Sequence, residues 1–246
     1  MPVNHGAAIP QAMIIGLDTA TEWVHVALVG GASAWTRISL TSPASTASAV
    51  LLPLLDELLK EAGTSRTDVK GVVACTGPGG FTSLRVGIAT AEGLAMAGTP
   101  SWGFSAFELR ARALAGHGPR GTVFLVLDGR RGEAFYQPWD IKTSQAVGPA
   151  GKTPLQGLAS VIGGQDWWAP ERFRQIASHH LESPPVALCN EGGATVDALV
   201  GLCRLCPSRP SENPLLPYYL RETDAEINFP GSSGHLGEAH RLGHAR

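Results

Sequence analysis

Short apolar runs that end in a polar residue alternate with segments of helical period along most of this chain. The runs 13–18, 23–29 and 33–40 are strand-like and are separated by tight turns, which predicts an antiparallel meander. Further strands are predicted at 69–75, 102–104, 122–127, 133–139 and 186–190. Helices are predicted at 82–97, 105–115, 154–162 and 194–206. Strands that alternate with helices in this way predict an α/β fold.

One helical segment contains a proline. Between Ser42 and Ala62 the apolar residues at 51, 54, 55, 58 and 59 fall on one helical face. Pro53 lies within this segment, and a proline in a helix interior costs about 3 kcal/mol or forces a kink. Two starts therefore stay open: near Leu51, with the proline in the first turn, or near Ser45, with a bend at the proline.

The turn Gly77-Pro78-Gly79-Gly80 leads from a buried strand into the helix 82–97. Three glycines and a proline leave the backbone of this turn bare, so a phosphate, a second helix or a partner protein is expected to approach it closely. The turn lacks the GxxxxGK[ST] pattern and its phosphate-neutralising lysine. Contact with a nucleotide phosphate, through Gly79, Gly80 and Arg85, is therefore the less favoured interpretation.

Small residues form a ridge on the helix that follows the turn. Ser83, Gly87, Ala91 and Ala95 are spaced i, i+4, and small residues on one ridge let two helices approach closely. The pattern favours close packing of this helix against a second helix, with plain core packing as an alternative.

Composition places the chain among ordinary globular proteins. Its 246 residues are enough for one large domain or two small ones, and its net charge of −2 gives no strong attraction for nucleic acid. There is no run of about eighteen apolar residues and no secretory signal, so a cytoplasmic location is expected. Cys203 and Cys206 form a CxxC without a second ligand pair, which predicts buried thiols rather than a zinc site.

Five segments carry a resemblance to a known family. They are Ile15-Gly16-Leu17-Asp18-Thr19-Ala20-Thr21, Gly77 to Gly87, Gly93-Leu94-Ala95, Leu127 to Glu133, and Tyr218-Leu220-Arg221. They occur in the same order as in the bacterial TsaB (YeaZ) family, and the resemblance covers roughly residues 13–225.

The resemblance implies a duplicated actin/Hsp70/sugar-kinase-like fold (ASKHA, ribonuclease H-like) with two lobes. The N-terminal lobe is expected at 13–116 with the partner-docking helices, and the C-terminal lobe at 117–217. A segment at 218–227 is expected to pack back on the body. Residues 1–12 and 228–246 are predicted to be a disordered extension and a disordered tail.

The resemblance also implies a function. TsaB-like proteins support a catalytic TsaD-like subunit, together with a TsaE-like ATPase, in forming threonylcarbamoyladenosine (t6A) on tRNA. The chain is accordingly expected to form a heterodimer with the TsaD-like subunit, to form a homodimer when that partner is absent, and to act on tRNA indirectly. Whether ATP or ADP binds at the partner interface stays open. The docking residues expected on the two helices are Ser83, Gly87, Ala91, Leu94, Ala95, Leu51 and Leu55.

Catalytic features of the superfamily are missing from the sequence. In the superfamily, the phosphate loop after the first strand has the sequence Asp-x-Gly-[Ser/Thr], whereas this chain has Asp18-Thr19-Ala20-Thr21. Ala20 puts a Cβ where a phosphate would need room. The stretch 45–52 lacks the histidine pair that holds the metal of TsaD-like subunits, and there is no HExxH. No catalytic or metal-binding residue is therefore predicted. A sugar-kinase-type phosphotransferase, a glycoprotease-like peptidase and an independent homodimer are the alternatives.

Overall fold

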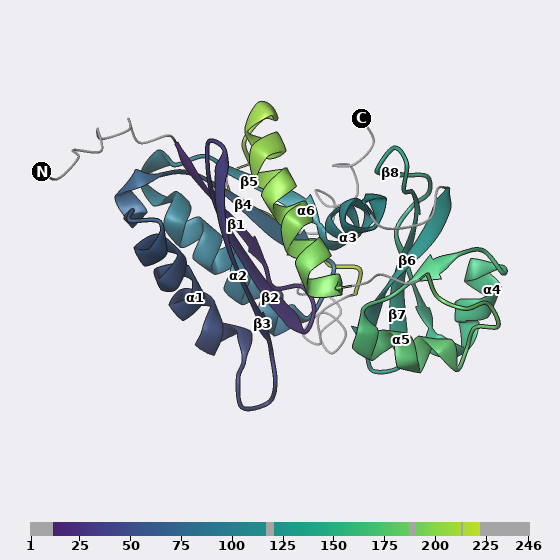
Figure 1. Ribbon diagram of the computed structural model, residues 1–246. Helices are drawn as coiled ribbons and strands as arrows, with labels where there is room; N and C mark the ends of the chain where they lie inside the picture. Colours follow the sequence, from purple (N-terminus) through teal and green to yellow (C-terminus); the bar gives the residue numbers. More distant parts are fainter. Residues whose placement is uncertain (1–11, 117–120, 187–189, 213, 222–246) are drawn as a thin grey trace, which may run out of the picture.

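The computed structural model describes residues 12–116, 121–186, 190–212 and 214–221. Two sheets, each with its own helices, form two lobes that meet at helix α3 (Figure 1). This is the duplicated ASKHA-like α/β fold that was expected. Among the described residues, no helix is long and apolar enough to cross a membrane.

The first sheet has five strands in the order β3-β2-β1-β4-β5. Its strands are β1 (Met13–Asp18), β2 (Trp23–Gly30), β3 (Ser33–Leu40), β4 (Val69–Gly77) and β5 (Ser101–Ser105). Strands β1 to β3 pair antiparallel, which confirms the predicted meander, and β4 and β5 continue the sheet parallel to β1. Strand β4 is buried on both faces because helices cover both sides of the sheet.

Two pairs of helices cover the two faces of this sheet (Figure 1). Helices α1 (Ala47–Glu61) and α2 (Phe81–Ala95) lie side by side on one face. Helices α3 (Ala106–Ala115) and α6 (Glu191–Leu205) pack together on the other. Ser105 caps α3 as predicted, since its hydroxyl accepts the N–H of Glu108 at 3.0 Å.

The structure decides between the two possible starts of helix α1 that the sequence left open. It begins at Ala47, close to the earlier of the two, and Pro53 lies inside it on the exposed side. The chain tolerates this proline because Leu51, Leu55 and Leu58 bury the opposite face in the core. The helix ends before Gly63, whose φ of +62° is a left-handed conformation that suits glycine.

The first two strands of the second sheet repeat the arrangement of β1 and β2 in the first sheet. Its strands are β6 (Thr122–Arg130), β7 (Glu133–Asp140), β8 (Gln145–Ala146), β9 (Gly151–Pro154) and β10 (Trp167–Trp168). Strands β6 and β7 pair antiparallel through a turn at Arg131-Gly132 that follows Asp128, as β1 and β2 pair through the turn that follows Asp18.

Short helices complete the described chain. They are α4 (Leu158–Ile162), α5 (Glu171–Ser178) and the 3-10 turns η1 (Arg66–Asp68), η2 (Met96–Gly98), η3 (Leu155–Gly157) and η4 (Cys206–Ser208). Helix α5 was not predicted. It spans only eight residues, most of them polar, and buries only Phe173 and Ala177.

Helix α6 departs from the predicted division into lobes. Its residues fall within 117–217, yet it packs on β1 and β2 of the first sheet. Gly16 of β1 makes this possible, because a Cβ there would lie 2.5 Å from Cys203 Sγ and 3.0 Å from Leu199 Cγ. The apolar face of α6 therefore belongs to the core of the N-terminal lobe.

The segment after α6 returns to the first lobe. The N–H of Tyr218 donates to the carbonyl oxygen of Thr76 at the end of β4 (2.7 Å), so Tyr218 lies against the first sheet. Residues 222–227 of the predicted segment 218–227 lie outside the described residues, and its packing as a whole stays a prediction. Cys203 and Cys206 are buried free thiols, and burial raises the pKa of Cys206 to about 11. The predicted extension apart from Ala12, most of the predicted strand 186–190, and the tail lie outside the described residues.

Candidate functional site

The chain itself fills the space beside the glycine turn. The N–H of Gly80 donates to the carbonyl oxygen of Ala20 at 2.9 Å, and a Cβ on Gly79 would overlap that same carbonyl group. Gly77 adopts φ +120°, and a Cβ there would lie 2.6 Å from the carbonyl oxygen of Tyr218. The bare backbone is thus used for contacts within the chain, because two other segments approach it at backbone distance.

Asp18, at the end of β1, is fully buried and both of its carboxylate oxygens are engaged. Oδ1 accepts the N–H of Ala20 at 3.0 Å. Oδ2 lies 2.8 Å from Nη1 of Arg110 on α3 and 3.1 Å from Nδ1 of His25 on β2. Burial alone would raise the pKa of Asp18, but Arg110 and His25 outweigh it and hold this pKa well below the usual range. The carboxylate is therefore ionised and neutralised inside the protein.

The residues around Asp18 do not fit a magnesium–phosphate site. Magnesium is commonly held by one or two carboxylates together with the phosphates of a substrate, and it needs room for several water ligands. Here Arg110 already supplies the positive charge, and the backbone of Ala20 lies directly against Gly79. Among the described residues, no three His, Cys, Asp or Glu side chains gather in a way that could hold a metal ion.

Helices α1 and α2 place several predicted docking residues in the core, which corrects the sequence-based assignment. Leu51, Leu55, Gly87 and Ala91 are all buried. A Cβ on Gly87 would overlap the hydroxyl of Thr19, so this glycine lets α2 approach the β1–β2 turn rather than a partner. The remaining predicted residues, Ser83, Leu94 and Ala95, are half-buried.

The outward faces of the same two helices carry accessible apolar residues beside exposed charged ones. Ala49, Leu52 and Pro53 of α1 are exposed, and Leu52 keeps 57% of its surface accessible. On α2 the exposed positions include Ala89 and Gly93, and Met96 in the following turn is 74% exposed. We call this surface (Ala49, Leu52, Pro53, Ala89, Gly93 and Met96) the outer helix face. It is the part of the two helices that could contact another protein.

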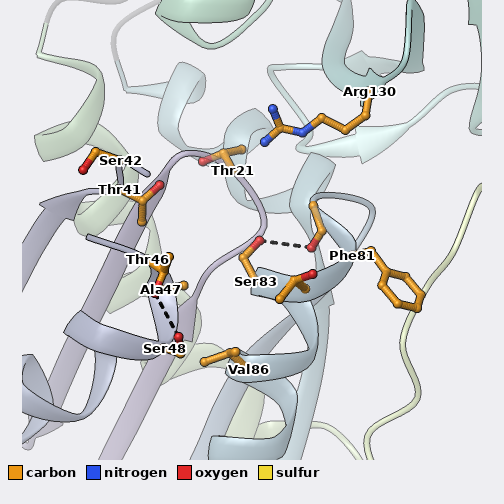
Figure 2. A pocket seen from close by; sticks show the side chains of 12 residues that line it. Thr21, Thr41, Ser42, Thr46, Ala47, Ser48, Phe81, Ser83, Val86 and Arg130 are labelled. Atoms are coloured by element: carbon orange, nitrogen blue, oxygen red, sulfur yellow. Dashed lines mark hydrogen bonds between the residues drawn. The ribbon is translucent and has the colours of Figure 1, made fainter. Parts of the chain in front are cut away.

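A pocket of about 390 Å³ opens at the N-termini of α1 and α2 (Figure 2). Seven of its twelve lining residues carry a hydroxyl group. The lining consists of Thr21, Thr41, Ser42, Thr46, Ala47, Ser48, Gly80, Phe81, Thr82, Ser83, Val86 and Arg130. Arg130 comes from the end of β6 in the second lobe, where it also pairs with Asp128 at 3.0 Å.

The three predicted phosphate-contact residues do not all face the pocket. Gly80 lines the pocket, whereas Gly79 packs on Ala20. Arg85 points elsewhere: its guanidinium carbon lies 3.8 Å from the centre of the Phe81 ring, and its Nε donates to the Tyr219 hydroxyl at 3.0 Å. Phosphate contact by these residues stays a prediction.

Sequence reasoning did not single out His25 or Arg110. Both are polar residues with apolar sequence neighbours: His25 lies between Val24 and Val26 of β2, and Arg110 between Leu109 and Ala111 of α3. A buried charged residue requires a partner, so this placement was the available signal. The partner itself could not be read from spacing, since Arg110 and Asp18 lie on separate elements.

Comparison with known proteins places these features in a family. A family model described as "TsaD: tRNA N6-adenosine threonylcarbamoyltransferase" matches residues 42–152. The chain is 33% identical over 124 residues to "tRNA threonylcarbamoyladenosine biosynthesis protein TsaB" of Escherichia coli, which covers 50% of this chain and 53% of that protein. The chain thus spans about half the length of the curated TsaB relatives it matches.

Two further likenesses cover more of the chain. An uncharacterized protein of Mycobacterium tuberculosis is 30% identical over 192 residues, 72% of this chain and 75% of that one. The solved structure "YeaZ from Pseudomonas aeruginosa" superposes with a TM-score of 0.69 at 24% identity, covering 85% of this chain and 100% of that chain, which shows the same fold. From its sequence relatives, and with a fold that agrees, the chain belongs to the TsaB/YeaZ family.

Proposed function

We propose that the chain is a non-catalytic supporting subunit in the formation of threonylcarbamoyladenosine on tRNA. The names of its TsaB relatives support the pathway. The closed turn around Asp18 supports the non-catalytic role, and it is the observation that carries the proposal. We expect a chain in which the backbone of Ala20 packs on the glycine turn and Arg110 neutralises Asp18 to contribute structure rather than chemistry.

The proposed partner is a catalytic TsaD-like subunit, and a TsaE-like ATPase is a further component of the assembly. In this proposal the chain acts on tRNA only indirectly, through the other subunits. We place the docking surface on the outer helix face, because it is apolar and exposed on two adjacent helices. Small residues such as Ala89 and Gly93 allow close approach of a partner helix. The same face would pair two copies of this chain when the partner is absent. The site of action is the cytoplasm, and ATP or ADP at the partner interface stays a prediction.

Two glycines allow a matched test of this docking surface. Gly93 on α2 and Gly201 on α6 are both exposed, and a Cβ at either one would meet no atom within 4 Å. Gly93→Arg should weaken binding to the TsaD-like subunit of the same organism at least about tenfold, or roughly 1.4 kcal/mol, because it places a large charged side chain on the interface. Gly201→Arg is the control and should leave binding unchanged.

Binding would be measured by isothermal titration calorimetry, and t6A formation on tRNA would be assayed with the purified partners. Omission of this chain should abolish or strongly reduce t6A formation. Equal affinity of Gly93→Arg and the unmodified chain would place docking elsewhere. Normal t6A formation without this chain would contradict the supporting role itself.

A further inference from the structure

The guanidinium of Arg110 contacts Asp18 directly. It is 2% exposed and comes from α3, a helix that packs against both sheets. Its Nη1 lies 2.8 Å from Oδ2 of Asp18, and its Nη2 donates to the hydroxyl of Thr21 at 3.0 Å. One side chain therefore holds both ends of the turn 18–21.

The turn 18–21 also fixes the position of the start of α2. The carbonyl oxygen of Ala20 accepts the N–H of Gly80 at 2.9 Å, and the hydroxyl of Thr19 donates to the carbonyl oxygen of Ser83 at 2.7 Å. Thr19 also fills the space that a side chain at position 87 would take. A chain of contacts thus runs from Arg110 through the turn to the first two turns of α2.

Charge balance explains why position 110 is occupied by an arginine. A buried carboxylate is unfavourable unless a cation or several donors neutralise it. His25 is buried, and burial lowers its pKa, so it contributes a hydrogen bond rather than a full positive charge. Arg110 is then the cation that balances Asp18. A second cation in the same place would be repelled by the first.

We propose that Arg110 is a built-in counter-cation that takes the place of a divalent metal ion beside Asp18 and locks the turn 18–21 onto the start of α2. It is a positioning residue, acting through Asp18 and Thr21. This inference does not depend on the proposed function, since it concerns the isolated chain.

The experiment compares thermal unfolding of four full-length proteins: the unmodified chain, Arg110→Met, Asp18→Asn and the double variant. Arg110→Met leaves a buried carboxylate without a cation, so its Tm should fall by roughly 10 °C. The double variant removes both charges and should recover at least half of that loss. Arg110→Lys, which keeps the charge, should lie closer to the unmodified chain than Arg110→Met does. If Arg110→Met is insoluble, a folded double variant supports the proposal and an insoluble one overturns it.

A second measurement separates a counter-cation from a residue that merely fills space. Arg110→Ala makes room beside Asp18, so 10 mM MgCl2 or MnCl2 is expected to raise its Tm by about 2 °C or more through ligand linkage. The unmodified chain and the variant that also carries Asp18→Asn should show no such rise. Equal Tm values of Arg110→Ala with and without these salts, or a rise in the unmodified chain, would overturn the proposal.

Discussion

Individual residues in this chain show how a site of the ASKHA-like fold can be kept and yet closed. Asp18 still ends the first strand, but its charge is satisfied by Arg110 and by a hydrogen bond from His25. His25 is 1% exposed, and its Nε2 is a buried nitrogen without a hydrogen-bond partner among the described residues. Protonation of this ring would place a second positive charge next to Arg110.

Stability should therefore fall as the pH is lowered from 7 towards 5. Burial lowers the pKa of His25 below its ordinary value of 6.5, although the Asp18 carboxylate opposes this shift. The unfolded chain binds a proton at His25 below about pH 6.5 that the folded chain does not, so stability is fully present above this pH and is lost below it. The slope from one such proton is at most about 1.4 kcal/mol per pH unit.

Urea unfolding of the unmodified chain and of His25→Asn at pH 7, 6 and 5 measures this effect. Burial raises the pKa of Glu191, which gives a trend of the opposite sign, but Glu191 is present in both proteins. The difference between the two pH profiles therefore isolates His25. Parallel profiles would show that His25 does not titrate as argued.

At the scale of elements, the main finding is the contact between the β1–β2 turn and the β4–α2 turn. The sequence indicated that something approaches the glycines closely, and the structure shows that the approaching group is Ala20 of the same chain. The small residues Gly87 and Ala91 likewise serve packing inside the chain. What remains for a partner is the outer helix face, on the opposite side of the same helices.

Gly79→Ala tests the turn contact, and Gly93→Ala is its control on α2. The new methyl group of Gly79→Ala overlaps a backbone carbonyl, so the free energy of unfolding should fall by about 2 kcal/mol. At Gly93 the methyl group meets no neighbour within 4 Å, and alanine is the better helix former, so stability should rise by about 1 kcal/mol. Chemical denaturation measures both changes, and a neutral Gly79→Ala would contradict the close contact.

At the scale of the whole molecule, the segment that follows α6 connects distant parts of the chain. It runs along β5, where the N–H of Glu212 donates to the carbonyl oxygen of Ser101 (2.7 Å). It then crosses the end of β4 at Tyr218 and reaches the second sheet, where Arg221 Nε lies 3.9 Å from Glu133 Oε2. Together with α6 on the first sheet, this segment makes the N-terminal lobe depend on residues from the end of the described chain.

Two neighbouring leucines test this dependence. Leu215 is 2% exposed and packs in the main core, whereas Leu216 is 55% exposed. Leu215→Ala should lower the free energy of unfolding by about 3 kcal/mol, and Leu216→Ala should change it by no more than about 0.5 kcal/mol. Similar effects of the two substitutions in urea unfolding would contradict a docked segment.

The sequence by itself determined most of the long elements and their order, but not α5 or the short strands β8, β9 and β10. Alternating apolar patterns located the meander, the buried strand at 69–75 and the repeat around Asp128, because these signals are local in the chain. Ala20, in place of a glycine, already indicated a closed phosphate loop.

Only the tertiary structure decided which face of each helix is buried and which charges meet. An i, i+4 ridge of small residues packs equally well against a partner helix or against its own β-turn, and Thr19 settles the matter for Gly87. Arg110 and α6 come from far along the chain, so no local pattern could place them beside Asp18 and Gly16. The physical reason is that burial and charge pairing depend on contacts in space, whereas periodicity reports only the sequence near each residue.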